Sequence, residues 1–199
     1  MKTLTNVFSN IYATNKWGNG SGPGSLPINS IRYRQSLINI LEQNDINTVL
    51  DYGCGDWQFS SLIEWNKYIS SYIGVDIVPT VINENKRKFT NQHIEFDLVN
   101  DNWTFPTVDL IICKDVLHHL SNTIVTTLLE NFKLHSNYLF LTNDITHVKK
   151  ITNQDCLNGK FRPLDLLKDP WNLKGDIVYE KDWEDHIKQG ILIKTSDII

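Results

Sequence analysis

The stretch that most constrains the fold of this chain is residues 47–57, Asn-Thr-Val-Leu-Asp-Tyr-Gly-Cys-Gly-Asp-Trp. Its apolar start is typical of a buried β-strand, and the two glycines that follow indicate a turn. Asp56 then begins an apolar-periodic segment, which predicts a helix directly after the turn. Glycines let the backbone approach a ligand closely, and a helix N-terminus directs unpaired N–H groups at it. The stretch therefore predicts a nucleotide-binding crevice.

The residues around this turn favour one class of nucleotide ligand. The dinucleotide fingerprint G-x-G-x-x-G requires a glycine where this chain has Gln58. The carboxylate of Asp56 would repel a diphosphate, whereas it suits a cationic ligand that bears sulfonium and ammonium groups. Asp76 ends a second strand-like run at about the spacing expected of a carboxylate that binds ribose hydroxyls. The pattern predicts a nucleoside ligand without a diphosphate.

Four segments of the chain form an ordered series of motifs: Leu50–Asp56, Tyr72–Asp76, Phe96–Leu98 and Asp109–Leu120. This series resembles that of class I S-adenosylmethionine-dependent methyltransferases. The resemblance implies S-adenosylmethionine as the cofactor. It also implies an α/β fold in which residues 1–199 form a single domain. That domain would contain a Rossmann-like, doubly wound and mostly parallel sheet, with a C-terminal antiparallel hairpin and helices on both faces.

The resemblance places the cofactor-binding residues in the glycine turn and at the ends of the predicted strands. Asp97, at the end of the third strand, is expected to accept a hydrogen bond from the adenine amino group, and Leu98 is expected to flank the ring. The alternative for Asp97 is a loop-capping role, and the alternative for Cys54 is a small buried apolar side chain. The complete predicted set is Asp51, Gly53, Cys54, Gly55, Asp56, Trp57, Asp76, Ile77, Asp97, Leu98 and Lys114.

The candidate catalytic residues lie in Lys114–Leu120. This segment follows an apolar run, residues 108–113, that is typical of a central parallel strand buried on both faces. We expect at most one of its two adjacent histidines to face the reacting centre. Because the resembling families place a histidine just before the leucine of this motif, His119 is the predicted general base. Asp115 is predicted to orient it or to bind sugar hydroxyls. The alternative for His119 is a structural histidine bonded to the backbone.

Two segments outside the motif series have their own predicted roles. Residues 1–30 contain a glycine-rich loop with a tryptophan and a proline, which we interpret as a lid over the cofactor, the alternative being a flexible linker. Residues 145–175 lack a sustained periodicity but are rich in aromatic and apolar residues, so we interpret them as an acceptor-side insertion. In this insertion Arg162 and Asp165 are candidate acceptor contacts, and Trp171 is a candidate stacking wall for a sugar. Alternatively, Arg162 is a buried structural arginine paired with Asp165.

A narrower resemblance suggests the class of acceptor. The segments Ser21–Ser25, Gly74–Pro79 and Phe161–Leu166, with Pro170–Trp171, are similar to a small methyltransferase subgroup that often accompanies glycan-building enzymes. This resemblance implies a small-molecule or saccharide acceptor, with O-methylation of a sugar or glycan hydroxyl as the reaction and no metal.

Two other kinds of methyltransferase remain as alternatives. One is a metal-dependent small-molecule O-methyltransferase, in which Asp115, Asn143 and Asp144 would hold Mg²⁺ through their oxygens. The other is a protein or nucleic-acid methyltransferase.

Charge and composition limit the classes of partner that we expect. The chain has 19 Lys plus Arg against 23 Asp plus Glu, a net charge of −4, which disfavours nucleic acid because phosphate binding needs a basic surface. No apolar stretch approaches the roughly 20 residues of a membrane span, so no membrane insertion is expected. The odd number of cysteines argues against a disulfide framework and for a reducing, cytoplasmic location. The sequence leaves the oligomeric state open.

Overall fold

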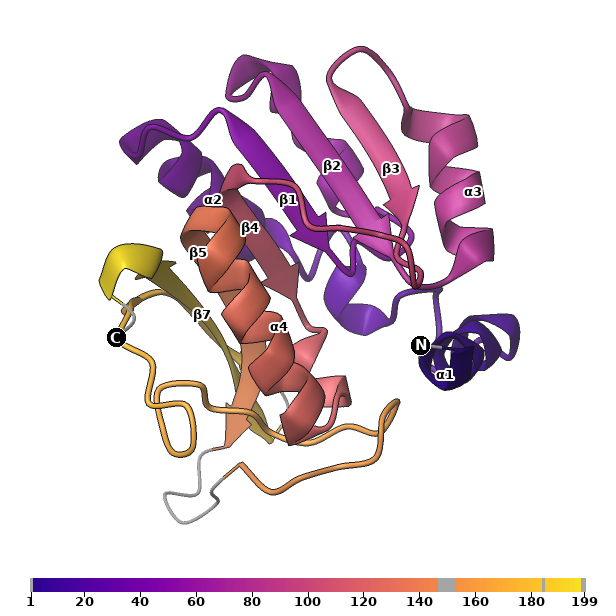
Figure 1. Ribbon diagram of the computed structural model, residues 1–199, viewed down its shortest axis with the longest axis vertical. Helices are drawn as coiled ribbons and strands as arrows, with labels where there is room; N and C mark the ends of the chain where they lie inside the picture. The colour runs from indigo at the N-terminus through magenta and orange to yellow at the C-terminus, as the bar shows by residue number, and fades with distance from the viewer. Residues whose placement is uncertain (1, 147–152, 184, 198–199) are drawn as a thin grey trace. The chain divides into compact units, whose positions relative to one another are not determined.

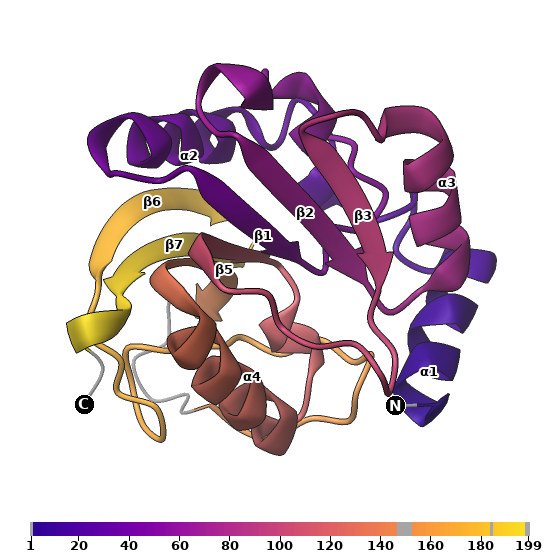
Figure 2. The ribbon, with the colours of Figure 1, turned by 45° about the horizontal axis from the view of Figure 1, so that its top comes forward.

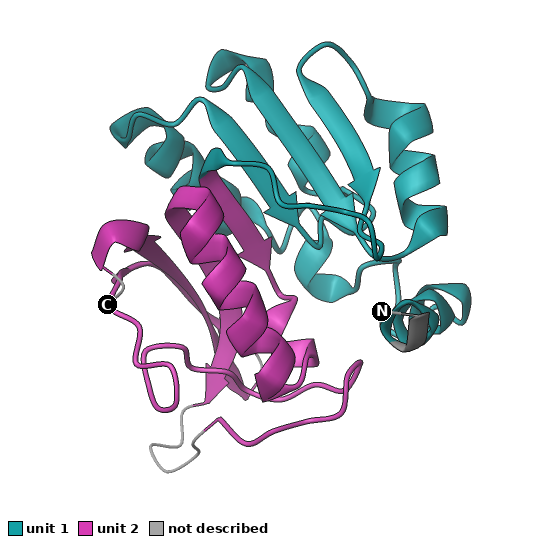
Figure 3. Ribbon diagram, in the orientation of Figure 1, with its two compact units in different colours: residues 1–109 teal, residues 110–199 magenta. Residues whose placement is uncertain are grey.

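The structure is a computed structural model that describes residues 2–146, 153–183 and 185–197. The chain divides into two compact units, residues 1–109 (unit 1) and residues 110–199 (unit 2), which Figure 3 shows in different colours. Unit 1 contains the glycine turn, and unit 2 contains the adjacent His118 and His119 and the C-terminal hairpin. Together the units hold seven strands.

Unit 1 is a parallel layer of strands with three helices. Its strands are in the order β3-β2-β1, and both neighbouring pairs are parallel, so the three strands end at the same edge (Figure 1). Tyr52 lies opposite Val75, and Asp76 lies opposite Leu98. The elements are α1 (Lys2–Ala13), α2 (Ile31–Gln43), β1 (Thr48–Tyr52), β2 (Ser71–Asp76), α3 (Pro79–Phe89) and β3 (Ile94–Leu98), with short 3-10 segments at Pro23–Ser25, Ser60–Leu62 and Trp65–Lys67.

The helices of unit 1 form where the apolar residues recur at helical spacing. In α2 the buried side chains are Tyr33, Leu37, Ile40 and Leu41, which lie on one face. In α3 Pro79 occupies the first helical position, where its missing N–H costs nothing, and the basic residues gather in the last turn, where they complement the helix dipole.

Unit 2 begins within β4 and is closed by an antiparallel hairpin. Its strands are in the order β4-β5-β7-β6, and β7 is antiparallel to both β5 and β6 (Figure 2). The helix of this unit packs on β5. The elements are β4 (Val108–Lys114), α4 (Asn122–His135), β5 (Ser136–Thr146), β6 (Asp176–Trp183) and β7 (His186–Lys194), with 3-10 segments at Leu117–His119 and Thr195–Asp197.

The predicted fold class is confirmed. The strands form a mostly parallel, Rossmann-like arrangement with a C-terminal antiparallel hairpin and flanking helices. The last strand begins at His186, so Lys188 lies within the hairpin. Among the described residues, no helix has the length and apolar character needed to cross a bilayer.

The predicted helix directly after the glycine turn is wrong. Residues 56–70 contain only the two short 3-10 segments, although their apolar residues fit a helical period. Trp57 has a φ of 59°, in the left-handed region that a right-handed helix cannot contain, and its indole donates to the Tyr72 hydroxyl at 2.7 Å. Tertiary anchoring of Trp57 therefore overrides the local pattern, and no helix N-terminus follows the turn.

Candidate functional site

The glycine turn follows β1 and is hydrogen-bonded to the end of β2. Gly53 and Gly55 have φ values of 78° and 55°, which explains the requirement for glycine at both positions. The N–H groups of Gly53 and Cys54 both donate to the Val75 carbonyl, at 2.8 and 2.9 Å. The Gly55 N–H donates to Asp76 at 3.1 Å. Most N–H groups of the turn therefore bind the neighbouring strand rather than point at a ligand.

Asp76 is the carboxylate that ties this turn to α3. Its second oxygen accepts the Val78 N–H at 3.0 Å, so both oxygens hold backbone. Burial raises the pKa of the Asp76 carboxyl to about 6, although the Val78 and Gly55 N–H groups act in the opposite direction. Ile77, which follows, is half-buried.

Three residues that were predicted to bind the cofactor have side chains inside unit 1. Asp51 is 2% exposed, and the Tyr72 hydroxyl donates to its carboxylate. Trp57 packs among aromatic rings, and Cys54 is buried beside Asn85, whose amide donates to the Gly55 carbonyl at 2.7 Å. Burial raises the pKa of the Cys54 thiol, which keeps it protonated. These side chains support the turn from inside unit 1.

The N-terminal glycine-rich segment is bonded to the turn. The Ser21 N–H donates to Asp56 Oδ2 at 3.1 Å, and the Asp56 N–H donates to Ser21 Oγ at 2.9 Å. The Tyr12 hydroxyl lies 2.7 Å from the same Ser21 Oγ. A Cβ on Gly55 would lie 2.4 Å from Ser21 Oγ, so the close approach depends on glycine. We call this reciprocal contact the Ser21–Asp56 latch.

One oxygen of Asp56 remains outside the latch. Asp56 Oδ1 is buried and has no hydrogen-bond partner among the described residues, while Oδ2 accepts from Ser21 and from the Gln58 amide. A buried carboxylate oxygen without a partner carries a desolvation cost that a cationic ligand would remove.

Asp97 and Leu98 lie at the end of β3. Asp97 is exposed, its Oδ1 accepts the Leu98 N–H at 2.9 Å, and the Lys86 ammonium lies 3.8 Å from the same oxygen. This is the loop-capping geometry that the sequence left open as an alternative to adenine recognition.

In unit 2, four charged side chains form one buried cluster. Asp115 follows β4 with a φ of 58°, a left-handed conformation that aspartate tolerates better than most residues. Its carboxylate binds the Lys114 ammonium on one oxygen and the Lys188 ammonium on the other, the latter at 2.8 Å. Lys188 also lies 2.9 Å from Asp144 Oδ1. We call Lys114, Asp115, Asp144 and Lys188 the charge quartet.

The charge quartet keeps Asp115 and Lys188 ionised. Burial opposes the charge of Asp115, but the Lys114 and Lys188 ammonium groups outweigh it and hold the pKa of that carboxyl below its usual range. Burial likewise opposes the charge of Lys188, yet Asp115 and Asp144 raise its pKa above the ordinary lysine value. For Asp144 burial and the nearby Asp115 charge prevail, and its pKa is raised. For Lys114 burial prevails, and its pKa is lowered.

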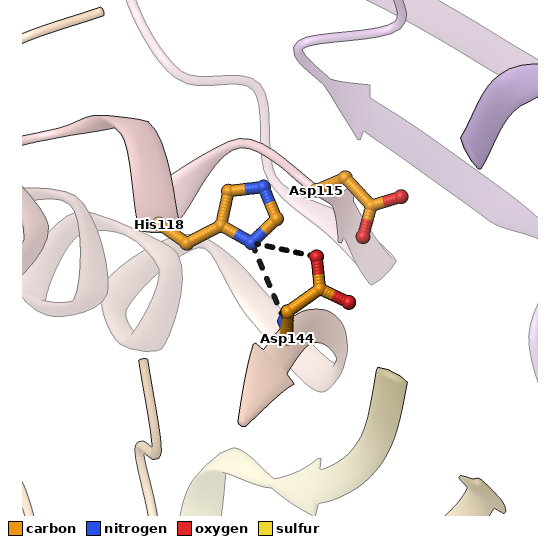
Figure 4. Close-up of side chains that lie close together, drawn as sticks. All are labelled: Asp115, His118 and Asp144. Atoms are coloured by element: carbon orange, nitrogen blue, oxygen red, sulfur yellow. Dashed lines mark hydrogen bonds and ion pairs between the residues drawn. The ribbon is translucent and has the colours of Figure 1, made fainter. Parts of the chain in front are cut away.

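The two adjacent histidines have different tautomers. His118 is 2% exposed, and its Nδ1 accepts the Asp144 N–H at 3.3 Å, so the neutral ring carries its proton on Nε2 (Figure 4). His119 Nδ1 lies 3.2 Å from the Lys160 carbonyl, which can only accept, so this ring is protonated on Nδ1 and its lone pair is on Nε2. Burial lowers the pKa of both imidazoles, so both are neutral near pH 7. In this state, His119 Nε2 can accept a proton, whereas His118 Nε2 can only donate.

Comparison with known proteins identifies the family. A sequence profile described as "Methyltransferase domain" matches residues 30–151. The chain belongs to this methyltransferase family.

Solved methyltransferases share the fold at low sequence identity. The DhpI–S-adenosylhomocysteine complex matches with a TM-score of 0.66 and 12% identity, covering 97% of this chain and 96% of that one. Magnesium protoporphyrin IX methyltransferase (ChlM) from Synechocystis PCC 6803, with S-adenosylmethionine bound, matches with a TM-score of 0.61 and 14% identity over 95% of each chain. At such identities the likeness concerns the fold alone.

A curated relative matches over a short stretch. Fifty residues of this methyltransferase are 42% identical to the mRNA cap guanine-N(7) methyltransferase of Schizosaccharomyces pombe. The match covers 25% of this chain and 13% of that protein.

The late segment of the methyltransferase, of which residues 147–152 lie outside the described part, docks on the start of α4 and on the histidines. Asp155 and Asn158 accept the N–H groups of Asn122 and Ser121, at 2.7 and 2.9 Å, and so cap α4 from outside the helix. The Gly159 N–H donates to the His119 carbonyl at 2.8 Å. The segment therefore holds the histidine turn in place.

The candidate acceptor residues of this segment make structural contacts. Arg162 is buried and donates to the carbonyls of Leu120 and Gln154, whereas Asp165 binds Lys168, so the proposed Arg162–Asp165 pair does not form. The Trp171 indole donates to Thr126 at 3.0 Å, and its ring lies 6.0 Å from the Arg162 guanidinium.

Strand geometry argues against the metal trio that the sequence left as an alternative. Asn143 and Asp144 are consecutive residues of β5, so their side chains point to opposite faces of the strand. The residues that do gather beside Asp115 are His118 and Asp144, whose candidate ligand atoms lie within 4.8 Å of one another (Figure 4).

Sequence reasoning missed Lys188, Ser21 and Asn85. Lys188 stands between Ile187 and Gln189 in β7, and only the pairing of β7 with β5 brings it opposite Asp144. Ser21 lies in the segment interpreted as a lid, but its bond to Asp56, like that of Asn85 to Gly55, joins residues 35 and 30 positions apart, which no local pattern indicates.

Proposed function

We propose that this protein transfers the methyl group of S-adenosylmethionine to a hydroxyl of a small polar acceptor, with a sugar as the expected class. The observation that carries the cofactor assignment is Asp56 Oδ1, a buried carboxylate oxygen without a partner at the edge of the glycine turn. The ammonium group of the cofactor's methionine part would supply the missing partner. A diphosphate at the same place would be repelled.

The acidic edge of unit 1 supports the same assignment. Asp56 and Asp76 flank the turn, and among the described residues of unit 1 their hydrogen-bond partners are backbone N–H groups and the Gln58 side-chain amide. Asp76 retains lone pairs for the ribose hydroxyls, since a carboxylate has about four acceptor sites. In this proposal the Ser21–Asp56 latch makes the glycine-rich segment within residues 1–30 a lid that orders Asp56.

Unit 2 supplies a general base, His119, with buried polar side chains around it. When bound, the cofactor supplies an electrophilic methyl group, and holding the acceptor in line with it accounts for much of the rate. His119 Nε2 removes the hydroxyl proton, because Nε2 is the unprotonated ring nitrogen in the neutral tautomer that the Lys160 carbonyl selects. Asp115 and the quartet around it offer both donors and acceptors to neighbouring hydroxyls.

A polar small molecule is favoured over a nucleic acid as acceptor. The net charge of −4 and the pairing of Lys114 and Lys188 with carboxylates leave these two lysines committed to the protein rather than to phosphates. The similarity to a cap methyltransferase nevertheless makes capped RNA a necessary arm of the test, because the two enzymes would share the cofactor fold.

Two experiments test the proposal. Calorimetry should show binding of S-adenosylmethionine and S-adenosylhomocysteine and none of NAD, and Asp56→Asn should weaken the binding while Glu95→Gln, at an exposed carboxylate of β3, should not. A transfer assay with methyl-labelled cofactor should then be run over nucleotide sugars, oligosaccharides, catechols, peptides and capped RNA. Binding of NAD alone would refute the cofactor assignment, and transfer only to RNA or peptide would refute the acceptor class.

A further inference from the structure

The charge quartet places a lysine where two carboxylates converge. The Lys188 ammonium lies 2.8 Å from Asp115 Oδ1 and 2.9 Å from Asp144 Oδ1, and its side chain is 5% exposed. Lys188 lies directly opposite Asp144 in the β5–β7 pairing, so the hydrogen-bond register of the hairpin sets this ion pair. The Trp183 ring, 5.7 Å from the ammonium, adds a favourable cation–π contact.

The same place has the donor set of a divalent-metal site. Asp115, His118 and Asp144 offer ligand atoms within 4.8 Å of one another, and two carboxylates with one imidazole suit Mn²⁺ or Zn²⁺. In this protein the ammonium binds both carboxylates, and His118 Nδ1 accepts the Asp144 N–H. A divalent cation would have to displace Lys188 and would be repelled by Lys114 as well.

We propose that Lys188 is the built-in cation of this centre. It is a positioning residue that takes the place of a divalent metal. It holds Asp115 and Asp144 where the acceptor hydroxyls bind, and this role in acceptor binding rests on the proposed function. Two consequences follow. The intact protein binds no divalent metal at this centre, and removal of the ammonium creates a metal site.

Manganese binding tests both consequences. Mn²⁺ is titrated into the full chain and followed by electron paramagnetic resonance, in the wild type, in Lys188→Ala and in Lys188→Gln. Lys181→Ala is the matched control, because Lys181 lies opposite Lys188 in the hairpin and its removal changes the net charge equally. A Lys188→Ala, Asp144→Asn double variant reports whether any bound Mn²⁺ uses this centre.

The expected result is a gain of function. Lys188→Ala should bind Mn²⁺ about tenfold or more tightly than the wild type, because a full positive charge about 3 Å from the donors has been removed. The double variant should lose that binding, and Lys181→Ala should behave as the wild type. Methyl transfer by the wild type should survive excess chelator, and Lys188→Gln should raise the acceptor KM with the cofactor Kd unchanged.

Three results would overturn the inference. The first is Mn²⁺ binding by the wild type that Asp144→Asn abolishes. The second is a folded Lys188→Ala that binds no more Mn²⁺ than Lys181→Ala, with Lys188→Gln deciding the matter if the alanine variant does not fold. The third is wild-type transfer that stops with chelator and returns with Mn²⁺. Because the first two are binding measurements, they decide the inference even if the proposed methyl transfer itself fails.

Discussion

The acidic edge of unit 1, formed by Asp56 and Asp76, and the charge quartet of unit 2 hold their carboxylates in opposite ways. In unit 1 Asp56 and Asp76 are bonded to backbone N–H groups, and Asp56 keeps one buried oxygen without a partner. In unit 2 Asp115 and Asp144 are paired with lysine ammonium groups. The first arrangement leaves negative charge for a ligand to neutralise, whereas the second is neutralised internally.

This difference predicts different functional contributions from the two units. Cation binding stabilises a centre whose carboxylates are uncompensated, so such a centre contributes to the affinity for its ligand. A centre whose charges are already paired gains little from a further charge and contributes a fixed geometry for hydroxyl groups. We therefore expect substitutions in unit 1 to change cofactor binding and substitutions in unit 2 to change turnover or stability.

The largest expected effect is on turnover in unit 2. His119→Gln should lower the single-turnover rate of methyl transfer by roughly 10²–10⁴-fold with the cofactor Kd retained, because the general base is lost. In the wild type, burial holds the pKa of His119 below 6.5, so the rate should be flat above that pH and fall in acid as the base is protonated. A normal rate in His119→Gln with an inactive His118→Gln would assign the base to the other histidine.

The next effect is on the free energy of unfolding. Asp115→Ala removes the carboxylate that pairs with both Lys114 and Lys188, so of the quartet only Asp144 remains to balance two buried ammonium groups, and the protein should lose about 3–5 kcal/mol of stability in denaturant titration. Asp97→Ala is the control, because its pair with Lys86 is exposed and should be worth less than about 1 kcal/mol. Equal losses in the two variants would remove the distinction between the quartet and a surface ion pair.

A smaller effect is expected on cofactor affinity in unit 1. Asp76→Asn should weaken S-adenosylmethionine binding by roughly 10–100-fold, about the value of hydrogen bonds to a charged acceptor. Burial raises the pKa of Asp76 to about 6, and ribose donors favour the ionised form, so wild-type affinity should fall as the pH drops below about 6. Calorimetry between pH 5 and 8 checks this. An unchanged pH profile in Asp76→Asn would assign the titration elsewhere.

The smallest effect concerns the Ser21–Asp56 latch. Gly55→Ala and Gly18→Ala both place a side chain at positive φ, at a cost of about 1 kcal/mol each. Only the first brings a Cβ to 2.4 Å from Ser21 Oγ, whereas nothing lies within 4 Å at Gly18. Gly55→Ala should therefore destabilise the protein by roughly 1 kcal/mol more in denaturant titration. Equal losses would mean that the lid segment adapts without cost.

The sequence predicted the local features of the fold well. The glycine turn, the acidic strand tips and the alternation of strands and helices follow from turn chemistry and apolar periodicity, both of which depend on neighbouring residues. The same reasoning failed at residues 56–70, where a helical period is present but Trp57 is bonded to Tyr72 on the next strand. Local periodicity carries no information about such an anchor.

What the sequence determined by itself is therefore the framework of the turn and its carboxylates, together with the choice of a cationic nucleoside over a diphosphate. The tertiary structure decided which way each site residue faces. The tautomers of His118 and His119 depend on the Asp144 N–H and the Lys160 carbonyl, and the partners of Lys188 depend on the register of the hairpin. These contacts join residues far apart in the chain, so only the packing of the folded protein determines them.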